Sequence, residues 1–505
     1  MRSVAVVKKP AAEAGEMPPP ALPDDVVSLR AQKAALPLYI TRIKVYPRAV
    51  AGLWRRVKWA VLVALLAIYY VVPWLRWERG PGAPNQAILL DLDGRRGWIF
   101  DIVIWPQEIY FVTGLLILAA FGLFLATSLF GRVWCGFACP QTVWTDLFLL
   151  VERLIEGDRT ARMRLDRAPM TLAKAARKTL KHTVWLAIAA ATGGAWIFYY
   201  VDAPSTLVRI FTGEASVEVY VFIGLLTATT YTLAGWAREQ VCTYMCPWPR
   251  FQSAMLDEQS LIVTYETFRG ETRGKHKAGD GWDGRGDCVD CNLCVAVCPV
   301  GIDIRDGQQL ECIGCGLCID ACNQTMAKVE RPANLIGWST LAAQEAKQAH
   351  VAAPGWRPVR PRTLLYGAML AVVAVAMIVA FALRTDTELT VQRDRSPNFV
   401  RLSNGDLRNS YAVKLLNKRR DVRHFSLSVE GLPGAALGFI GADVEGTGAA
   451  TRLTVHPDTV ATFRVFLTVS ATAPPSGSTS IDFIARDAES HATVTHGSVF
   501  VGPAH

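Results

Sequence analysis

The chain has 505 residues, of which 51% are apolar and only 19% are charged, and its mean hydropathy is +0.23. This length predicts about three domains, and the apolar excess is too large for a purely soluble protein and excludes disorder or a collagen-like chain. We therefore expect a membrane protein. The net charge of +9 is weak evidence for nucleic-acid binding, because loops on one side of a bilayer explain a basic excess equally well.

Residues 1–37 are rich in Pro, Ala and scattered charge, and such a composition cannot bury enough apolar surface to fold. We expect a flexible N-terminal tail there. The first residues also lack the apolar core and small-residue cleavage site of a signal peptide, which predicts that the N-terminus stays in the cytoplasm.

Five stretches reach the roughly 20 apolar residues that cross a bilayer core. They are residues 57–75, 109–131, 182–201, 217–237 and 363–383. Lys and Arg in short loops resist translocation, and the loop 132–181 carries ten of them whereas the loop 202–216 carries only Arg209. With five spans, this asymmetry places the loop 132–181 and the segment 238–362 in the cytoplasm, and residues 384–505 in the periplasm.

Residues 384–505 contain short runs in which apolar and polar residues alternate, as in strands with one buried face. The clearest runs contain Tyr411, Val413 and Leu415, then Phe425, Leu427 and Val429, then Phe463, Val465, Leu467 and Val469. Gly, Pro, Asn and Asp separate about seven such runs, which predicts an antiparallel sandwich of immunoglobulin type. The segment holds no Cys and no catalytic constellation, so a docking module is favoured over an active site.

All twelve Cys lie between residues 135 and 322, on or at the predicted cytoplasmic side. Structural disulfides belong to oxidising compartments, so this placement indicates metal or redox chemistry instead.

Eight of these cysteines form two CxxCxxCxxxC runs, at residues 288–298 and 312–322. In bacterial ferredoxins the three close thiolates of one run hold a [4Fe–4S] cluster together with the distant fourth cysteine of the other run. This pattern predicts one cluster on Cys288, Cys291, Cys294 and Cys322, and a second on Cys312, Cys315, Cys318 and Cys298. Zinc knuckles are the alternative, but zinc sites commonly recruit His, and no His lies between residues 276 and 350.

The other four form two CxxxCP motifs, Cys135 and Cys139 before Pro140, and Cys242 and Cys246 before Pro247. Each motif follows an apolar span and an Arg, which makes a weak internal repeat. Proline favours the first helical position, so both second cysteines would be N-caps, where the helix dipole favours thiolate. If a helix ran through each pair instead, both sulfurs would share one face. Either geometry predicts a two-sulfur clamp suited to Cu(I), and the alternative is plain packing at helix ends.

Three further features have plainer interpretations. Met245 could add a thioether to the clamp, but packing is the favoured role. His182 could ligate copper or shuttle a proton, but at the start of a span an interfacial anchor is favoured. Asp146, Glu152 and Glu156 accompany an amphipathic stretch and are expected on a solvated helix face.

Four segments resemble, in the same order, the cytochrome c oxidase accessory proteins of the CcoG family, also called FixG or RdxA. They are GRVWCGFACPQTVWTD, CTYMCPWPRFQSAML, CVDCNLCVAVCPVGIDIRDG and CIGCGLCIDAC. The resemblance runs from about residue 38 through the C-terminal domain. It implies a two-cluster ferredoxin of the bacterial inner membrane, with a periplasmic immunoglobulin-like tail, that acts with other factors in assembling cbb-type haem-copper oxidases. It also implies reduction of Cu(II) to Cu(I), with Cys135, Cys139, Cys242 and Cys246 as candidate copper ligands.

The expected architecture is a multi-domain membrane protein built on a five-helix transmembrane bundle. Its parts are the tail 1–37, spans 1 to 4 with both CxxxCP motifs (38–250), a cytoplasmic bacterial ferredoxin-type domain (251–362), span 5 (363–383) and the all-β sandwich 384–505.

The leading hypothesis for function is a cupric reductase, in which a donor reduces the clusters and an electron passes to Cu(II) near the CxxxCP thiols. A quinol-linked conduit to a protein acceptor and a non-enzymatic scaffold or copper chaperone are the alternatives. The chain has no CxxCH haem motif and no GxGxxG dinucleotide motif, so electrons are expected from a partner or a quinol. A copper exporter is a further expected partner, because oxidase copper is needed across the bilayer.

Overall fold

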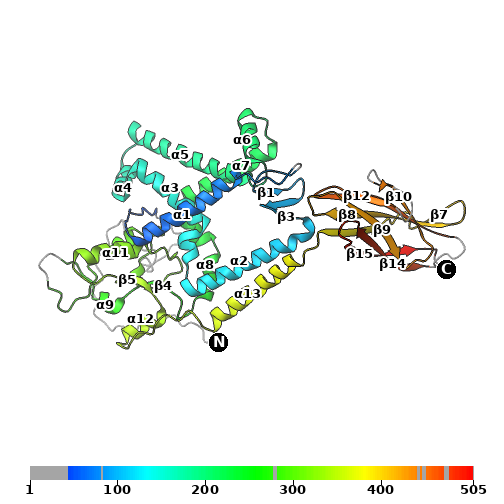
Figure 1. Cartoon of the computed structure of the whole chain (residues 1–505). Helices are drawn as coiled ribbons and strands as arrows, with labels where there is room; N and C mark the ends of the chain where they lie inside the picture. The colour runs from blue at the N-terminus through cyan, green and yellow to red at the C-terminus, as the bar shows by residue number, and fades with distance from the viewer. Residues whose placement is uncertain are drawn as a thin grey trace. The chain divides into compact units, whose positions relative to one another are not determined.

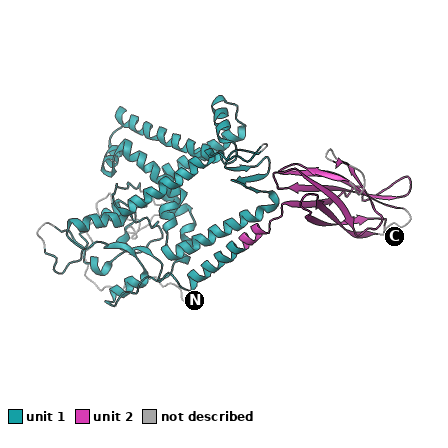
Figure 2. Ribbon diagram, in the orientation of Figure 1, with its two compact units in different colours: residues 1–375 teal, residues 376–505 magenta. Residues whose placement is uncertain are grey.

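The computed structural model describes residues 44–80, 83–276, 281–440, 444–445, 451–470 and 477–503, so the predicted tail 1–37 lies outside the described residues. The chain divides into two compact units, Met1–Val375 and Ala376–His505 (Figure 2). The first unit contains every cysteine, and the second is all β-strand after the end of one long helix.

Six long helices account for much of the chain before the sandwich (Figure 1). They are α1 (Leu53–Val71), α2 (Ile109–Phe130), α3 (Pro140–Glu156), α5 (Leu172–Ile197), α7 (Val217–Thr230) and α13 (Pro361–Ala382). Among the described residues, four helical segments are long and apolar enough to cross a membrane: Leu53–Trp74, Pro106–Phe130, Val217–Ala237 and Pro361–Ala382. These four coincide with four of the five predicted spans.

The remaining predicted span, residues 182–201, falls largely in α5. This helix begins ten residues earlier and carries Lys174, Lys178 and Lys181 in its first turns, so its full length is less apolar than the other four. The five-helix count therefore stays a prediction.

Short elements join the long helices. A three-stranded antiparallel sheet, β1 (Ile88–Asp91), β2 (Arg96–Ile99) and β3 (Ile102–Ile104), separates α1 from α2. The buried Arg79 supports it by donating to the carbonyl oxygens of Gln86 and Ala87, at 2.8 and 2.7 Å. Two short helices, α4 (Arg159–Arg167) and α6 (Ala203–Thr212), flank α5.

The expectation of a solvated face for the acids of α3 is wrong. Asp146, Glu152 and Glu156 are 4%, 1% and 3% exposed. Cations surround them: Arg55 and Lys58 pair with Asp146, Arg162, Lys181 and Arg238 pair with Glu152, and Lys178 and Lys181 pair with Glu156. Most of these partners are distant in the sequence, so the pattern of α3 alone could not reveal them. Buried carboxylates need such pairing, because an isolated charge is costly to remove from water.

Residues 251–362 fold around a two-stranded antiparallel sheet of β4 (Ile262–Tyr265) and β5 (Ile336–Ser339). Helices α8 (Trp248–Met255), α9 (Thr267–Gly270), α10 (Leu293–Ala296), α11 (Leu317–Lys328) and α12 (Leu341–Gln348), with the 3₁₀ turn η6 (Ile304–Asp306), complete this region. Its core packs Val263, Ile319, Met326, Leu335 and Ile336 against cysteine side chains. The core thus positions the thiols.

The second unit is a sandwich of two sheets. One has the order β10-β13-β8-β6, with β7 on β8, and the other has the order β11-β12-β9-β14-β15. The strands are β6 (Thr387–Arg393), β7 (Val400–Arg401), β8 (Leu407–Asn417), β9 (Arg423–Glu430), β10 (Ala436–Ile440), β11 (Val444–Glu445), β12 (Arg452–Val455), β13 (Thr459–Val469), β14 (Ser478–Asp487) and β15 (Thr493–Val501). The alternating runs predicted around Tyr411, Phe425 and Phe463 are strands β8, β9 and β13, and their apolar residues line the core. The predicted sandwich is present.

Candidate iron-sulfur site

Two cavities in residues 251–362 are lined by the cysteines of the CxxCxxCxxxC runs. We call the first the Cys288 cavity. Its cysteines are Cys288, Cys291, Cys294 and Cys322. The first three come from the loop before α10 and from α10 itself, whereas Cys322 reaches the cavity from the middle of α11, in the other run. The arrangement can present four sulfurs to one inorganic group.

We call the second the Cys312 cavity. It is lined by Cys298, Cys312, Cys315 and Cys318, and Cys294 also reaches its wall. Cys298 belongs to the first run, so each cavity takes one cysteine from the opposite run. Because Cys294 borders both, the two cavities are neighbours.

Burial keeps several of these thiols protonated when no metal is bound. It raises the pKa of Cys298 and of Cys322 to about 12, and that of Cys312 to about 11. A coordinated thiol is deprotonated by the metal's charge, and metal binding therefore releases protons here. All twelve cysteines are free thiols, so none is committed to a disulfide. The donor set fits iron-sulfur clusters, which are held by cysteine sulfur.

The two CxxxCP motifs fold alike. In each, the first cysteine lies in a π-helical turn, η3 (Trp134–Ala138) or η5 (Val241–Met245), and the second cysteine follows that turn with extended backbone. Cys139 is the N-cap of α3, as predicted, and Pro140 is its first residue. The second N-cap prediction is wrong by one residue, because Pro247 rather than Cys246 precedes α8. The turn therefore ends between the two sulfurs of each pair.

The two motifs interlock. Gln252 of α8, after the second motif, accepts hydrogen bonds from the Cys135 thiol at 3.1 Å and from the Arg132 Nε at 3.2 Å. Gln141 of α3, after the first motif, donates to the carbonyl oxygen of Arg238 at 3.2 Å. Each following helix thus reaches back to the other motif, which brings the two cysteine pairs together.

The pKa shifts of Cys135 and Cys242 also indicate that the two cysteine pairs are close to each other. Burial raises the pKa of Cys135 to about 12 and that of Cys242 to about 11. Arg132 opposes both shifts, while Cys139 and Cys246 add to them, so these groups lie within range of one another.

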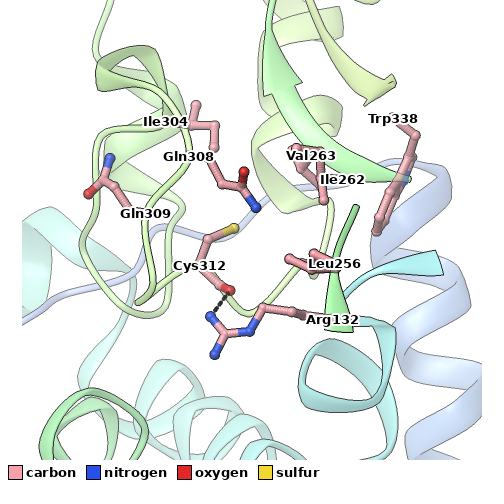
Figure 3. Close-up of a pocket in the computed structure, with 10 residues that line it drawn as sticks. Arg132, Leu256, Ile262, Val263, Ile304, Gln308, Gln309, Cys312 and Trp338 are labelled. Carbon is pink, nitrogen blue, oxygen red and sulfur yellow. Dashed lines mark hydrogen bonds between the residues drawn. The ribbon is translucent and has the colours of Figure 1, made fainter. Parts of the chain in front are cut away.

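The first CxxxCP motif also contacts the Cys312 cavity. A Cβ added at Gly136 would lie 2.8 Å from the carbonyl oxygen of Gly314 and 3.0 Å from the Cα of Cys315. Arg132 donates to the carbonyl oxygens of Cys312, at 2.8 Å, and of Leu310. Figure 3 shows this guanidinium below Cys312, in a pocket that Ile262, Val263 and Trp338 also line. At Gly136, the backbone of this motif therefore lies directly against the backbone beside Cys315.

Asp320, between Cys318 and Cys322 on α11, holds residues 251–362 to the first span. Its carboxylate accepts hydrogen bonds from the amide nitrogens of Trp54, at 3.3 Å, and Arg55, at 2.8 Å. These amides belong to the first turn of α1, which has no capping side chain from its own N-cap residue, Gly52. A carboxylate there satisfies open N–H groups and complements the helix dipole.

Replacing Asp320 with alanine is expected to lower the free energy of unfolding by about 1 kcal/mol, because the cap of α1 is lost. Asp320→Asn keeps an acceptor and should cost less. Chemical denaturation in detergent measures both, with amide hydrogen exchange at Trp54 and Arg55 as the local readout. Equal stability of the alanine variant and wild type would show that the cap contributes nothing.

The other two candidate residues have no described bond to a cysteine. Met245 is 62% exposed, so it does not pack in a core. The His182 Nδ1 is 2.9 Å from the Tyr231 hydroxyl, and its ring stacks near Trp236 at 6.1 Å between centroids. Gln252 and Gly136 were missed by sequence reasoning. The glycine between the two cysteines of CGFAC was a signal that could have identified Gly136, whereas nothing in the local sequence marks Gln252.

Three family models match the chain. One described as a 4Fe-4S binding domain matches residues 112–156, and one described as a 4Fe-4S dicluster domain matches residues 237–341. The third, described as an IG-like fold at the C-terminal of FixG, matches residues 377–503, which agrees with the predicted sandwich.

Two relatives cover nearly all of the chain. The nitrogen fixation protein FixG of Rhizobium meliloti is 49% identical over 494 residues, which is 92% of this chain and 94% of the relative. Protein RdxB of Cereibacter sphaeroides is 48% identical over 470 residues, with 92% and 97% covered. Among solved structures, a FixG-related protein from Vibrio parahaemolyticus is 24% identical and covers 23% of this chain and 97% of its own, with a TM-score of 0.20.

Proposed function

Because the chain belongs to the FixG family, we propose that it is a membrane-bound iron-sulfur protein that passes electrons to Cu(II) during assembly of a cbb-type haem-copper oxidase. The observation that carries this proposal is the pair of neighbouring cavities, each lined by at least four cysteines drawn from both runs. Cys288, Cys291, Cys294 and Cys322 would hold one cluster, and Cys312, Cys315, Cys318 and Cys298 the other. A bound [4Fe–4S] cluster supplies one-electron redox chemistry.

The contribution of the protein's own residues is to hold the cysteine-bearing loops in place. Asp320 and Arg132 join the cysteine-bearing loops to α1 and to the first CxxxCP motif, so the cavities are held at the end of the membrane helices. The walls are apolar, with Val263, Ile302 and Ile304 lining the Cys312 cavity. A low-dielectric wall of this kind tunes reduction potential and limits access of water.

We place the N-terminus and residues 251–362 in the cytoplasm and the sandwich in the periplasm of a bacterial cell with two membranes. The basic residues of the loop 132–181 support this orientation, because they resist translocation. The expected partners are oxidase assembly factors, a copper exporter and an electron donor, such as a quinol or a reduced protein. The sandwich is the docking module of this proposal.

Cu(II) would be reduced near the CxxxCP thiols. Cys246 is exposed, and the adjacent Met245 thioether is exposed too. Soft sulfur donors stabilise Cu(I) relative to Cu(II) and so favour reduction of the arriving ion. A cluster held by these cysteines would supply one electron for each Cu(II) that becomes Cu(I), and the external donor would replace that electron.

The test compares the number of Cu(I) ions formed with the number of electrons that the clusters lose. Protein in detergent is reduced without oxygen, freed of excess reductant and mixed with Cu(II) and a chromogenic Cu(I) chelator. We expect one Cu(I) for each electron lost from the clusters, and a loss of at least tenfold in rate when all eight cysteines of the two runs are changed to serine.

Met170→Leu, at an exposed methionine outside both CxxxCP motifs, is the matched control for altered sulfur content, and it should leave the clusters intact. Copper reduction by the eight-serine variant at the rate of the wild type would overturn the proposed path. Clusters that a quinol reduces but that do not transfer electrons to Cu(II) would identify a quinol-linked conduit instead.

A further inference from the structure

We propose that the buried guanidinium of Arg132 raises the reduction potential of the cluster held in the Cys312 cavity, and so draws the electron toward the first CxxxCP motif. This role rests on the proposed function only in requiring that the cysteine cavities hold clusters. It belongs to a side chain that supplies no cluster ligand. It does not depend on whether copper is the final electron acceptor.

Arg132 lies between the first CxxxCP motif and the Cys312 cavity. Its Nη1 donates to the carbonyl oxygen of Cys312, at 2.8 Å, and to that of Leu310. Its Nε donates to the side chain of Gln252 at 3.2 Å. Figure 3 shows the side chain directed toward Cys312. These hydrogen bonds from two sides of the guanidinium fix its positive charge beside one cavity.

The charge of Arg132 is not neutralised by a carboxylate in the part of the chain that the structure describes, although the residue is only 8% exposed. Seven other buried cations do pair with a carboxylate: Arg55, Lys58, Arg162, Lys181, Arg238, Arg305 and Arg423. A buried charge is costly unless it is paired. The thiolates of Cys312 and its neighbours, once they hold a cluster, would supply the missing negative charge.

The Cys288 cavity has a different charge environment. Arg305 lines it, but this guanidinium lies 2.6 Å from a carboxylate oxygen of Asp290 and 2.6 Å from one of Asp303, which neutralise its charge. The residues that line the Cys312 cavity are apolar side chains, a glycine and cysteines. Arg132 therefore distinguishes the two cavities electrostatically.

A nearby positive charge favours the reduced state, because reduction adds one electron from the external donor and no bond forms or breaks. Such an interaction is stronger in the low-dielectric interior than in water, and cluster potentials depend on nearby charge and on solvent exposure. The Cys312 thiol already responds in this sense. Burial raises its pKa, and Arg132 opposes that rise by favouring negative charge on the sulfur.

A redox titration without copper measures the effect. Protein purified in detergent without oxygen is titrated with dithionite, and electron paramagnetic resonance follows the reduction of each cluster. In Arg132→Gln, the ratio of reduced to oxidised cluster at a given potential should fall at least tenfold for one cluster, a shift of about 59 mV in a one-electron couple. The other cluster should keep its potential. Cys298→Ser should abolish the step that shifts, because Cys298 lines the Cys312 cavity.

Gln252→Glu tests the charge without removing the guanidinium. It places a carboxylate of nearly the same shape at the 3.2 Å contact with Nε, so it should neutralise Arg132 and lower the same potential. Arg132→Lys keeps the positive charge and should keep most of the potential. Arg250→Gln is the matched control, because it removes an exposed positive charge from α8, where water and salt screen it. It should leave both potentials unchanged.

Unchanged potentials in Arg132→Gln and Gln252→Glu, or equal shifts of both clusters, would overturn the proposal. A count of about eight irons per chain shows that a variant keeps both clusters. If Arg132→Gln loses iron, the titration of Gln252→Glu decides. Failure to reduce Cu(II) would leave these potentials unchanged, whereas wild-type protein without iron would overturn the proposed function together with this role of Arg132.

Discussion

Cys322→Ser is expected to remove the cluster of the first run, although Cys322 belongs to the second. The reason is that Cys322 lines the Cys288 cavity, with Cys288, Cys291 and Cys294. Cys298→Ser should conversely remove the cluster of the second run, because Cys298 lines the Cys312 cavity. Each variant should lose about four irons, and the spin coupling between the two reduced clusters should disappear from the electron paramagnetic resonance spectrum.

Thr325→Val provides a control in the same cavity. Thr325 lies on α11 one turn beyond Cys322, and its hydroxyl is 3.8 Å from the Cys291 sulfur. It supplies no cluster ligand, so the iron count should remain unchanged. If Cys322→Ser instead removed the cluster of the second run, each run would be self-contained and the crosswise assignment would fail. Double variants with a cysteine of either run then show which cluster remains.

Glu152→Gln is expected to lower the free energy of unfolding by about 3–5 kcal/mol, because it leaves buried cations around a neutral amide. The Glu152 carboxylate lies 2.8 Å from Arg162, 3.1 Å from Arg238 and 3.6 Å from Lys181. These contacts join α3 to α4, to α5 and to the start of the second CxxxCP motif. Thermal unfolding in detergent, followed by tryptophan fluorescence, measures the loss.

Glu345→Gln on the exposed face of α12 is the matched control and should change stability by less than about 0.5 kcal/mol. Burial alone would raise the pKa of Glu152, but Arg238, Arg162 and Lys181 outweigh it and lower the pKa from 4.5 to about 2. The stabilisation is therefore complete above pH 4.5 and is lost as the pH falls toward 2. The variant should lack this part of the acid dependence. Equal unfolding temperatures for Glu152→Gln and wild type would contradict the ion network.

The local patterns of the sequence predicted those parts of the fold that depend on neighbouring residues. The cysteine spacing of each run and the alternation around Tyr411, Phe425 and Phe463 can be recognised within a dozen residues, and those predictions agree with the cavities and the sandwich core. Four spans were long and uniform enough to recognise in the same way.

The contacts that sequence reasoning missed join residues far apart in the chain. Glu152 depends on Arg238, 86 residues later, and Arg55 takes its cap from Asp320, 265 residues later. A helical pattern records which face is polar but not whether a cation from another element covers it. The two CxxxCP motifs could likewise be recognised as a repeat, but the contact between them depends on tertiary hydrogen bonds such as that of Gln252 with Cys135.

The close approach of Gly136 to the Gly314 backbone has a mechanical consequence. Many redox proteins carry a cofactor on a tethered lobe that swings between donor and acceptor, and the default for joined domains is relative motion. Here the backbone of Gly136 lies so close to that of Gly314 that a Cβ would not fit, and a swing would break the Asp320 cap and the Arg132 bonds at once. We therefore expect the proposed electron transfer to cross a rigid junction, with a rate independent of linker length and of solvent viscosity.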